Sequence, residues 1–367
     1  MEDLGIDQKF LVPTQTRPLT DVAGSYTYFA DGDVLLAKIT PCFENGKLGI
    51  AADLTNGIGF GSSEYIVFRP DASVDKEWLY YFLAQPRFRD EGAERMSGAV
   101  GHKRVAKDFI EGYPIPIPPL PEQRRIVGIL DEAFDGIATA KANAEKNLQN
   151  ARALFESHLQ SVLTQFGEKG ARVRIEDACD SVMDCVNKTA PKVDGPTPFK
   201  MIRTTNVRNG LVSLDSVNYV TENVYRVWTR RQVPKPGDVI LTREAPMGEV
   251  GMLLSDDNVF LGQRLVSYRA NPAKLNNRFL LYALQSGDLQ RQIRALASGS
   301  TVQHMRVPDS KNLQLPLPGL REQEETVATL DSLRADTDRL ASIYQQKLAA
   351  LDELKKSLLH QAFSGEL

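Results

Sequence analysis

The sequence predicts an α+β fold in which two globular mixed α/β domains, related by an internal repeat, are separated by two long coiled-coil helices. Three observations lead to this prediction. The 367-residue chain is 25% charged and 42% hydrophobic, an ordinary composition for a folded chain, and its length suits two or three domains. Its two halves resemble each other, and each half ends in a long stretch of helical periodicity.

The internal repeat is clearest in a proline-rich element. PIPIPPLPEQRRIVGILD at 114–131 returns as QLPLPGLREQEETVATLD at 314–331, at an offset of 200 residues. Three more pairs of stretches match in the same order, namely 32–41 with 237–246, 78–83 with 279–284, and SGAVGHKRV at 97–105 with SGSTVQHMRV at 298–307. Offsets that drift by a few residues indicate two copies of one unit with loop insertions.

Each copy predicts the same order of elements. In the first half, residues 34–39 and 65–69 have the composition of strands, with glycine-rich turns between them, and 78–88 predicts a short amphipathic helix. The prolines that follow lack amide donors, so they predict an extended segment that ends where Pro121 opens a helix.

Two long helices follow the proline-rich segments. From Glu122 to about Phe166, and again from Val327 to Ala362 with a stop at Gly365, apolar or small residues recur at spacings of three and four. Each apolar seam must be covered, and the other helix offers a seam of equal length. An antiparallel pair would place the two globular domains at opposite ends, and a parallel pair would place both at one end. A coiled coil between two chains is the alternative.

Charge differs between the predicted segments, although the net charge of −3 excludes a uniformly basic nucleic-acid binder. The first domain, 1–120, has 12 basic and 17 acidic residues, and the helix and linker at 121–171 have 6 and 7. The second domain, 172–320, has 20 and 14, and the second helix, 321–367, has 6 and 9. The second domain is therefore the basic part, with arginines suited to guanine edges and phosphates. A surface of scattered arginines is the alternative.

Signatures of catalysis and metal binding are missing. Gly46-Lys47 is followed by Leu48 and does not form a phosphate-binding loop, the histidines are widely spaced, and the three cysteines form no C-x-x-C pair. We therefore expect a chain that is not an enzyme and holds no metal. The sequence contains no apolar run of about 18 residues that could span a membrane. Its three cysteines fit a reducing, cytoplasmic location.

Four stretches together resemble a known family. AKITPCFENGK at 37–47, GIGFGSSEYIVFRP at 57–70, the element at 114–131 and KKSLLHQAFSGEL at 355–367 are similar to the specificity (S) subunit, HsdS, of Type I restriction-modification systems. The resemblance covers essentially the whole chain. It implies two target-recognition domains, each binding one half of a split DNA sequence, and two antiparallel helices that set the number of unread base pairs.

The resemblance also implies partners. These are double-stranded DNA, two modification subunits that methylate adenine, and restriction subunits that translocate and cleave DNA in phage defence. S-adenosylmethionine, ATP and magnesium are expected on those partner subunits, and no cofactor is expected on this chain. The alternatives are a coiled-coil interaction protein or a truncated S subunit with partial DNA recognition. A self-contained DNA methyltransferase or nuclease is less favoured because its motifs are missing.

Carried over position by position, the resemblance implies a set of candidate DNA-binding residues in these motifs. Polar side chains in turns between strands can reach the groove edges while the strands hold them still. A structural role in a turn is equally open for each. In the first domain they are Lys38, Thr40, Asn45, Lys47, Ser62, Ser63, Glu64 and His102; in the second they are Thr242, Arg243, Glu244, Gln263, Arg264, Gln303 and His304.

The first domain is expected to be N-terminally short. At an offset of 205 residues, the start of the second domain at Arg172 maps about 34 residues before Met1. The first domain is therefore compact, or continues upstream of this sequence, or belongs to a truncated subunit. In the last case the basic second domain would dominate DNA affinity.

Overall fold

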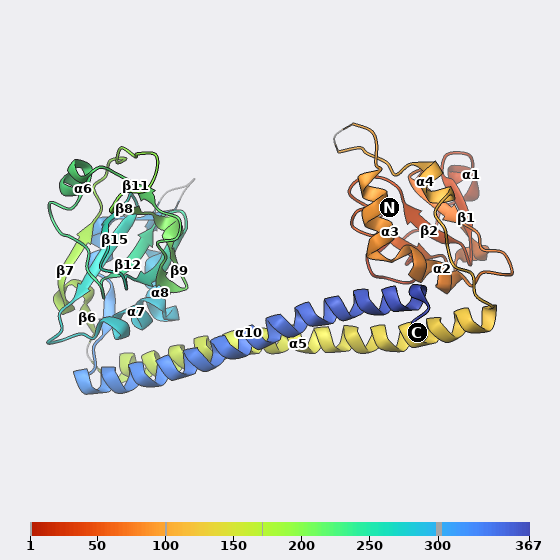
Figure 1. Ribbon diagram of the computed structural model, residues 1–367. Helices are drawn as coiled ribbons and strands as arrows, with labels where there is room; N and C mark the ends of the chain where they lie inside the picture. The colour runs from red at the N-terminus through yellow and green to blue at the C-terminus, as the bar shows by residue number, and fades with distance from the viewer. Residues whose placement is uncertain (1, 100, 171, 299–302) are drawn as a thin grey trace. The chain divides into compact units, whose positions relative to one another are not determined.

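The computed structural model describes residues 2–99, 101–170, 172–298 and 303–367. The chain forms two compact units, unit 1 (Met1–Lys146 and Tyr344–Leu367) and unit 2 (Asn147–Ile343). Each unit contains β-sheet, short helices and one part of each long helix, α5 (Leu120–Lys169) and α10 (Leu320–Ser364) (Figure 1). The prediction of two mixed α/β domains and two long helices is confirmed.

Unit 1 contains a three-stranded antiparallel sheet of order β3-β2-β5 and a separate antiparallel pair, β1 and β4. Its strands are β1 (Thr27–Ala30), β2 (Val34–Ala37), β3 (Leu48–Ile50), β4 (Ile58–Gly61) and β5 (Tyr65–Phe68). Its short helices are α1 (Leu19–Val22), η1 (Thr55–Gly57), α2 (Lys76–Leu83), α3 (Pro86–Glu94) and α4 (Lys107–Glu111). The single helix expected at 78–88 is therefore two helices, because the second starts with Pro86, which favours a first helical position.

Unit 2 contains a six-stranded sheet of order β7-β15-β12-β13-β10-β9 and a three-stranded sheet of order β11-β8-β14. Its strands are β6 (Arg172–Arg174), β7 (Cys179–Asp184), β8 (Phe199–Ile202), β9 (Val207–Arg208), β10 (Gly210–Val212), β11 (Asn218–Tyr219), β12 (Val239–Arg243), β13 (Met247–Met252), β14 (Asn258–Leu261), β15 (Leu265–Ala270), β16 (Ala297–Ser298), β17 (His304–Met305) and β18 (Gln314–Pro316). Its short helices are η2 (Ile175–Ala178), η3 (Thr204–Asn206), α6 (Glu222–Trp228), α7 (Asn277–Gln285), α8 (Gly287–Ala295) and α9 (Val307–Lys311).

The internal repeat has a structural basis in a pair of buried aspartates. Asp33 is 2% exposed and accepts two hydrogen bonds from Arg69, at 2.8 and 2.6 Å. Its equivalent Asp238 is 1% exposed and accepts two from Arg269, at 2.8 and 2.7 Å. In each unit the carboxylate also caps the turn before it, by accepting a backbone N–H three residues upstream. The GDV sequence recurs because both units build the same turn into the sheet.

A buried glutamine explains the repeated EQ dipeptide. The Gln123 side chain accepts a hydrogen bond from the Asp75 N–H at 2.8 Å and donates to two backbone carbonyls, those of Ser73 and Pro118. Gln323 makes the same three bonds in unit 2, with Asn276, Lys274 and Pro318. Both glutamines are 0% exposed. Each one satisfies buried backbone groups where a long helix meets the loop before a short helix.

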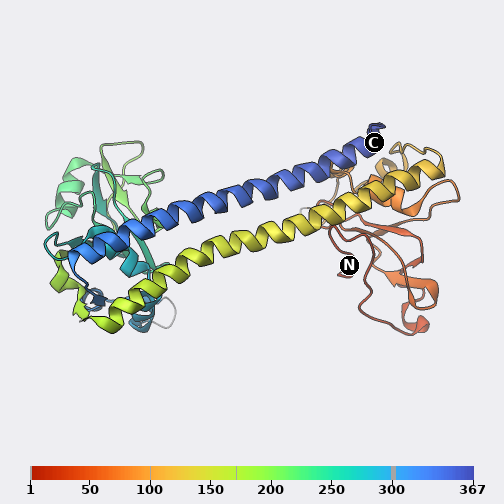
Figure 2. The ribbon, with the colours of Figure 1, turned by 90° about the horizontal axis from the view of Figure 1, so that it is seen from below.

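The long helices run antiparallel within unit 1. Lys141 of α5 forms an ion pair with Asp352 of α10 at 2.7 Å, and Arg125, earlier in α5, donates to the carbonyl of Leu367, which follows α10, at 2.8 Å. In unit 2 the guanidinium of Arg334 on α10 lies 4.2 Å from the ring centroid of Phe155 on α5. Figure 2 shows both helices in each unit. The two long helices therefore contact each other within this chain, in the antiparallel sense.

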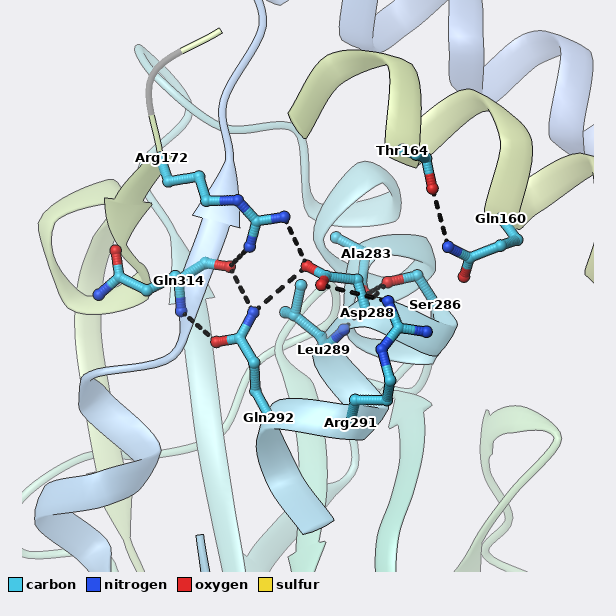
Figure 3. A network of polar contacts seen from close by, with 10 residues as sticks. All are labelled: Gln160, Thr164, Arg172, Ala283, Ser286, Asp288, Leu289, Arg291, Gln292 and Gln314. Carbon is cyan, nitrogen blue, oxygen red and sulfur yellow. Dashed lines mark hydrogen bonds and ion pairs between the residues drawn. The ribbon is translucent and has the colours of Figure 1, made fainter. Parts of the chain in front are cut away.

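A polar network links β6, α8 and β18 at the edge of unit 2 (Figure 3). Arg172 of β6 forms an ion pair with Asp288 of α8 at 2.8 Å. The Gln292 side chain bonds both backbone groups of Gln314 in β18, which pairs with β6. Figure 3 also shows Gln160 of α5 beside this network. The extended segment predicted before the second long helix is thus a short strand, β18, held on both sides.

The two units differ upstream of their common strands. In unit 2, β7 pairs with the outer edge of β15, whereas β5 of unit 1 pairs with β2 alone among the described residues. The strand β14 pairs with β8 in parallel, but its equivalent β4 pairs with β1 in antiparallel. At the offset of 205 residues, the region expected to be absent from the first domain corresponds to 172–205 of unit 2, which contains β6, η2, β7 and β8. No helix in the described part of the chain is long and apolar enough to cross a membrane.

Candidate nucleic-acid interface

Backbone hydrogen bonds bring three loops of unit 1 together at the end of β2. The N–H of Lys38 donates to the carbonyl of Glu64 at 2.9 Å, and the N–H of Val105 donates to the carbonyl of Lys38 at 2.9 Å. The N–H of Thr40 donates to the carbonyl of Lys103, also at 2.9 Å. The connections at 38–47, 62–64 and 97–104 therefore meet where the sheet holds their first residues still.

Most candidate residues of unit 1 belong to this loop cluster. The Lys38 ammonium donates to the carbonyl of Ser63 at 2.9 Å, and Ser62 Oγ accepts from the Glu64 N–H at 3.1 Å. His102 is exposed in the third loop. Residue 100 of that loop lies outside the described residues.

Asn45 and Lys47 occupy the other end of the β2–β3 connection. The N–H of Asn45 donates to the carbonyl of Pro41, and that of Lys47 donates to the carbonyl of Cys42, each at 2.9 Å. Between them Gly46, at φ 74°, lies so close to Arg89 of α3 that a Cβ would be 2.7 Å from its Nη1. These contacts give the turn a packing role against α3.

Arg104, which was not among the predicted site residues, carries the main charge contact of the cluster. Its Nε and Nη2 donate to the two carboxylate oxygens of Glu64 at 2.9 and 2.7 Å. These hydrogen bonds hold the pKa of Glu64 below its usual value, so the pair is charged at neutral pH. The available signal was that Arg104 recurs as Arg306 in the repeat.

Unit 2 gathers the equivalent loops in the same way. The N–H of Arg243 donates to the carbonyl of Arg264 at 2.8 Å, as Lys38 does to Glu64 in unit 1. Arg264 Nη1 lies 2.6 Å from Glu244 Oε2. Gln263 adjoins Arg264, Gln303 is exposed, and His304 pairs with Ser298 across β16 and β17. Residues 299–302 of this loop lie outside the described residues.

Two of the predicted DNA-binding residues, Thr242 and Arg243, make structural contacts within unit 2. Thr242 is 0% exposed, and its hydroxyl donates to the carbonyl of Pro246 at 2.6 Å and accepts from the N–H of Glu249 at 2.9 Å. The Thr242 side chain therefore has no exposed surface in this structure and holds the β12–β13 connection, and its contact with DNA stays a prediction. Arg243 donates to the carbonyl of Met305 at 2.8 Å and thereby fastens β17 to β12.

Several arginines that make unit 2 basic are also engaged within the fold. Their acceptors are carboxylates or backbone carbonyls, and the arginines are Arg203, Arg208, Arg226, Arg231 and Arg269. Arg230 is exposed, and its side chain forms no hydrogen bond or ion pair with the described residues. Within the described ranges, no group of three or more His, Cys, Asp or Glu side chains is placed to hold a metal ion.

The fold defines a class of protein with two repeated mixed α/β units and two long helices. The family model for the Type I restriction modification DNA specificity domain matches residues 17–149 and 187–349. The matched ranges cover most of the chain, once in each half. The chain therefore belongs to this family, as the resemblance in its sequence implied.

Named relatives agree with this assignment. The chain is similar to the EcoAI specificity subunit of Escherichia coli, with 47% identity over 108 residues, which are 29% of this chain and 18% of the relative. It is also similar to the MjaVIII specificity subunit of Methanocaldococcus jannaschii, with 24% identity over 310 residues, or 80% of this chain and 71% of the relative. The match to the first relative thus spans less than a fifth of its length.

Solved structures share the fold. An HsdS subunit from Thermoanaerobacter tengcongensis has a TM-score of 0.66 at 20% identity, with coverage of 100% of this chain and 89% of that one. A chain from a study of complex assembly and conformational transition in the type I R-M system has a TM-score of 0.75 at 21% identity, over 94% and 85% of the two chains. At this level of identity the likeness concerns the fold.

Proposed function

We propose that this chain is the DNA sequence-recognition subunit of a Type I restriction-modification complex. Each unit binds one half of a bipartite double-stranded site, and the chain directs adenine methylation and restriction by its partners. One observation carries the proposal: the DNA specificity domain matches twice, and each matched half presents a loop cluster with an ion-paired arginine. Polar loops on a fixed sheet suit the reading of groove edges.

The chemistry belongs to the partners in this proposal. Two modification subunits would bind S-adenosylmethionine, restriction subunits would use ATP and magnesium, and the complex would act in the cytoplasm. This chain would have no catalytic site of its own. Its candidate residues are arginines, lysines, histidines, glutamates and neutral polar side chains in turns, which suit recognition and positioning on DNA.

Deleting the gene for this chain tests the proposal. An adenine-methylation map of the source cell should lose one bipartite motif, and the gene supplied on a plasmid should restore it. Methylation that stays unchanged at every adenine motif would contradict the proposed function.

Shortening both long helices tests whether they set the spacing. Removing about one helical turn, roughly four residues, from each helix should change the number of unread base pairs and leave both half-site sequences as they were. The methylation map reads both quantities at once. A changed half-site sequence would count against this role, and an unshortened chain carrying four substitutions on exposed helix positions is the control.

A further inference from the structure

An arginine–glutamate pair occurs in the loop cluster of both units, but it is built from different residues. In unit 1, Arg104 from the third loop is held by Glu64, which precedes β5. In unit 2, the position before β15 is Arg264, and it is held by Glu244 from the β12–β13 connection. Glu64 and Arg264 are equivalent, since each accepts the same backbone bond from the end of the neighbouring strand. Both units therefore have an arginine–glutamate ion pair in the loop cluster, but the two pairs are formed by residues at different positions of the repeat.

The two arginines are presented alike. The Arg104 and Arg264 side chains are each 47% exposed, whereas their partners Glu64 and Glu244 are 20% and 15% exposed. In both pairs the glutamate is thus the covered member and the arginine faces solvent.

Each guanidinium keeps hydrogen-bond donors for a ligand. A guanidinium has five N–H groups. Arg104 uses three of them, two on Glu64 and one on the carbonyl of His102 at 3.2 Å. Arg264 has one ion-pair contact among the described residues, with Glu244. The remaining donors lie in one plane, which matches the paired acceptors O6 and N7 of guanine.

Stability does not explain these pairs. Exposed ion pairs contribute little to folding because solvent screens them and both side chains must be ordered. Two buried contacts that stabilise the fold recur residue by residue in the two units, those of Asp33 and Asp238 and those of Gln123 and Gln323. A pair that changes its residues between two otherwise equivalent units is what two different half-sites require.

We propose that Arg104 and Arg264 each read a guanine, one in each half of the DNA site, and that Glu64 and Glu244 are positioning residues which hold these arginines ready. The inference rests on the proposed function and adds the residues that determine specificity. Arg264 lies at φ 71°, a backbone region that an arginine rarely adopts, so the turn itself directs this side chain. The Glu64 and Glu244 carboxylates keep the two guanidinium groups ordered before DNA binds.

The test uses the complex purified through this chain from its own cells, and duplexes that carry its methylated motif. Arg104→Ala should lower the preference for guanine at one base pair of one half-site by roughly 5- to 150-fold, the range of one bidentate base contact. Arg264→Ala should do the same in the other half-site only. Arg104→Lys keeps the positive charge but lacks the planar guanidinium that makes a bidentate contact, so it should lose the same preference.

The positioning role has its own readout. Glu64→Gln should weaken the preference at the base pair that Arg104→Ala identifies, and the salt dependence of binding should stay as in the wild type. Arg87→Ala in unit 1 and Arg321→Ala in unit 2 are controls, because these arginines are 78% and 90% exposed and also form ion pairs. Neither should alter any base preference.

Other outcomes overturn the inference. If Arg104→Ala weakens binding to all sequences equally while Arg104→Lys binds normally, Arg104 contacts phosphate. If both variants keep every base preference, Arg104 lies outside the DNA contact. In either case a wild-type complex that still selects a bipartite site leaves the proposed function standing, whereas a wild type without any sequence selection removes that function first.

Discussion

Replacing Leu330 with alanine is expected to lower the free energy of unfolding of unit 2 by about 2–5 kcal/mol. Leu330 on α10 is 0% exposed and belongs to one apolar cluster with Leu159 of α5 and Phe279 of α7. Truncation would remove buried methyl groups and leave a cavity between both long helices and the domain. Leu130, its repeat equivalent on α5, is also 0% exposed, so Leu130→Ala should have the same effect on unit 1.

The two tryptophans of the chain allow each unit to be followed separately, since Trp78 lies in unit 1 and Trp228 in unit 2. Fluorescence in a denaturant titration reports unit 2 in a Trp78→Phe background and unit 1 in a Trp228→Phe background. Leu340→Ala is the control in unit 2, because Leu340 on α10 is 39% exposed and should change stability by no more than about 0.5 kcal/mol. Equal losses from Leu330→Ala and Leu340→Ala would show that burial on the domain is not what anchors α10.

The sequence predicts the repeat and the long helices well because both leave periodic or ordered marks in one chain. The stop at Gly365 is an example: the glycine has φ 82°, the left-handed conformation that commonly ends a helix. The sequence shows that the two glutamines recur, but it does not show which groups their side chains bind. Gln123 and Gln323 satisfy carbonyls and N–H groups that lie about 50 residues away, and such partners become known only when the chain is folded.

The contacts of Asp131 and Asp331 show where a repeat misleads. Both aspartates accept a hydrogen bond from a tyrosine of the preceding short helix, Tyr81 and Tyr282. Asp331 also binds Arg278, but the equivalent of Arg278 in unit 1 is Glu77. Lys9 contacts both Glu77 and Asp131 and so supplies the missing cation. The charge balance of a site can therefore be kept by a residue from an unrelated segment, which pairwise matching does not reveal.

The candidate site was predicted only in part for the same reason. The sequence indicated which residues lie in turns between strands, and the loops that carry these residues do lie together in each unit. Whether a side chain is exposed depends on register, and Thr242 is 0% exposed whereas the Arg264 side chain is 47% exposed. Arg104 was passed over because its importance comes from Glu64, 40 positions earlier in the sequence.

Arg269→Ala is expected to cost unit 2 about 3–5 kcal/mol, because it leaves a buried carboxylate without its cation. Asp238 would retain the backbone N–H of Lys235 at 2.9 Å but lose both bonds from Arg269. The Arg269 side chain is 25% exposed, so water has limited access to take its place. Adding Asp238→Asn removes the unpaired charge and should recover part of the loss; denaturation followed by Trp228 measures both variants.

Arg69→Ala in unit 1 tests whether the cost of losing the cation depends on how deeply that cation is buried. Asp33 is as buried as Asp238, but the Arg69 side chain is 61% exposed, so water can replace it and the loss of stability should be smaller than for Arg269→Ala.

Burial raises the pKa of Asp33, but hydrogen bonds from Arg69 and the Ala30 N–H outweigh this effect, and the net pKa of Asp33 is lowered. A lowered pKa stabilises the fold above the unfolded value of about 3.9, and this contribution is lost as the pH falls through the folded value. The difference between wild type and Arg69→Ala should therefore be full at pH 7 and shrink below about pH 4. A difference that stays constant to lower pH would mean that Arg69 acts through the packing of its aliphatic stem.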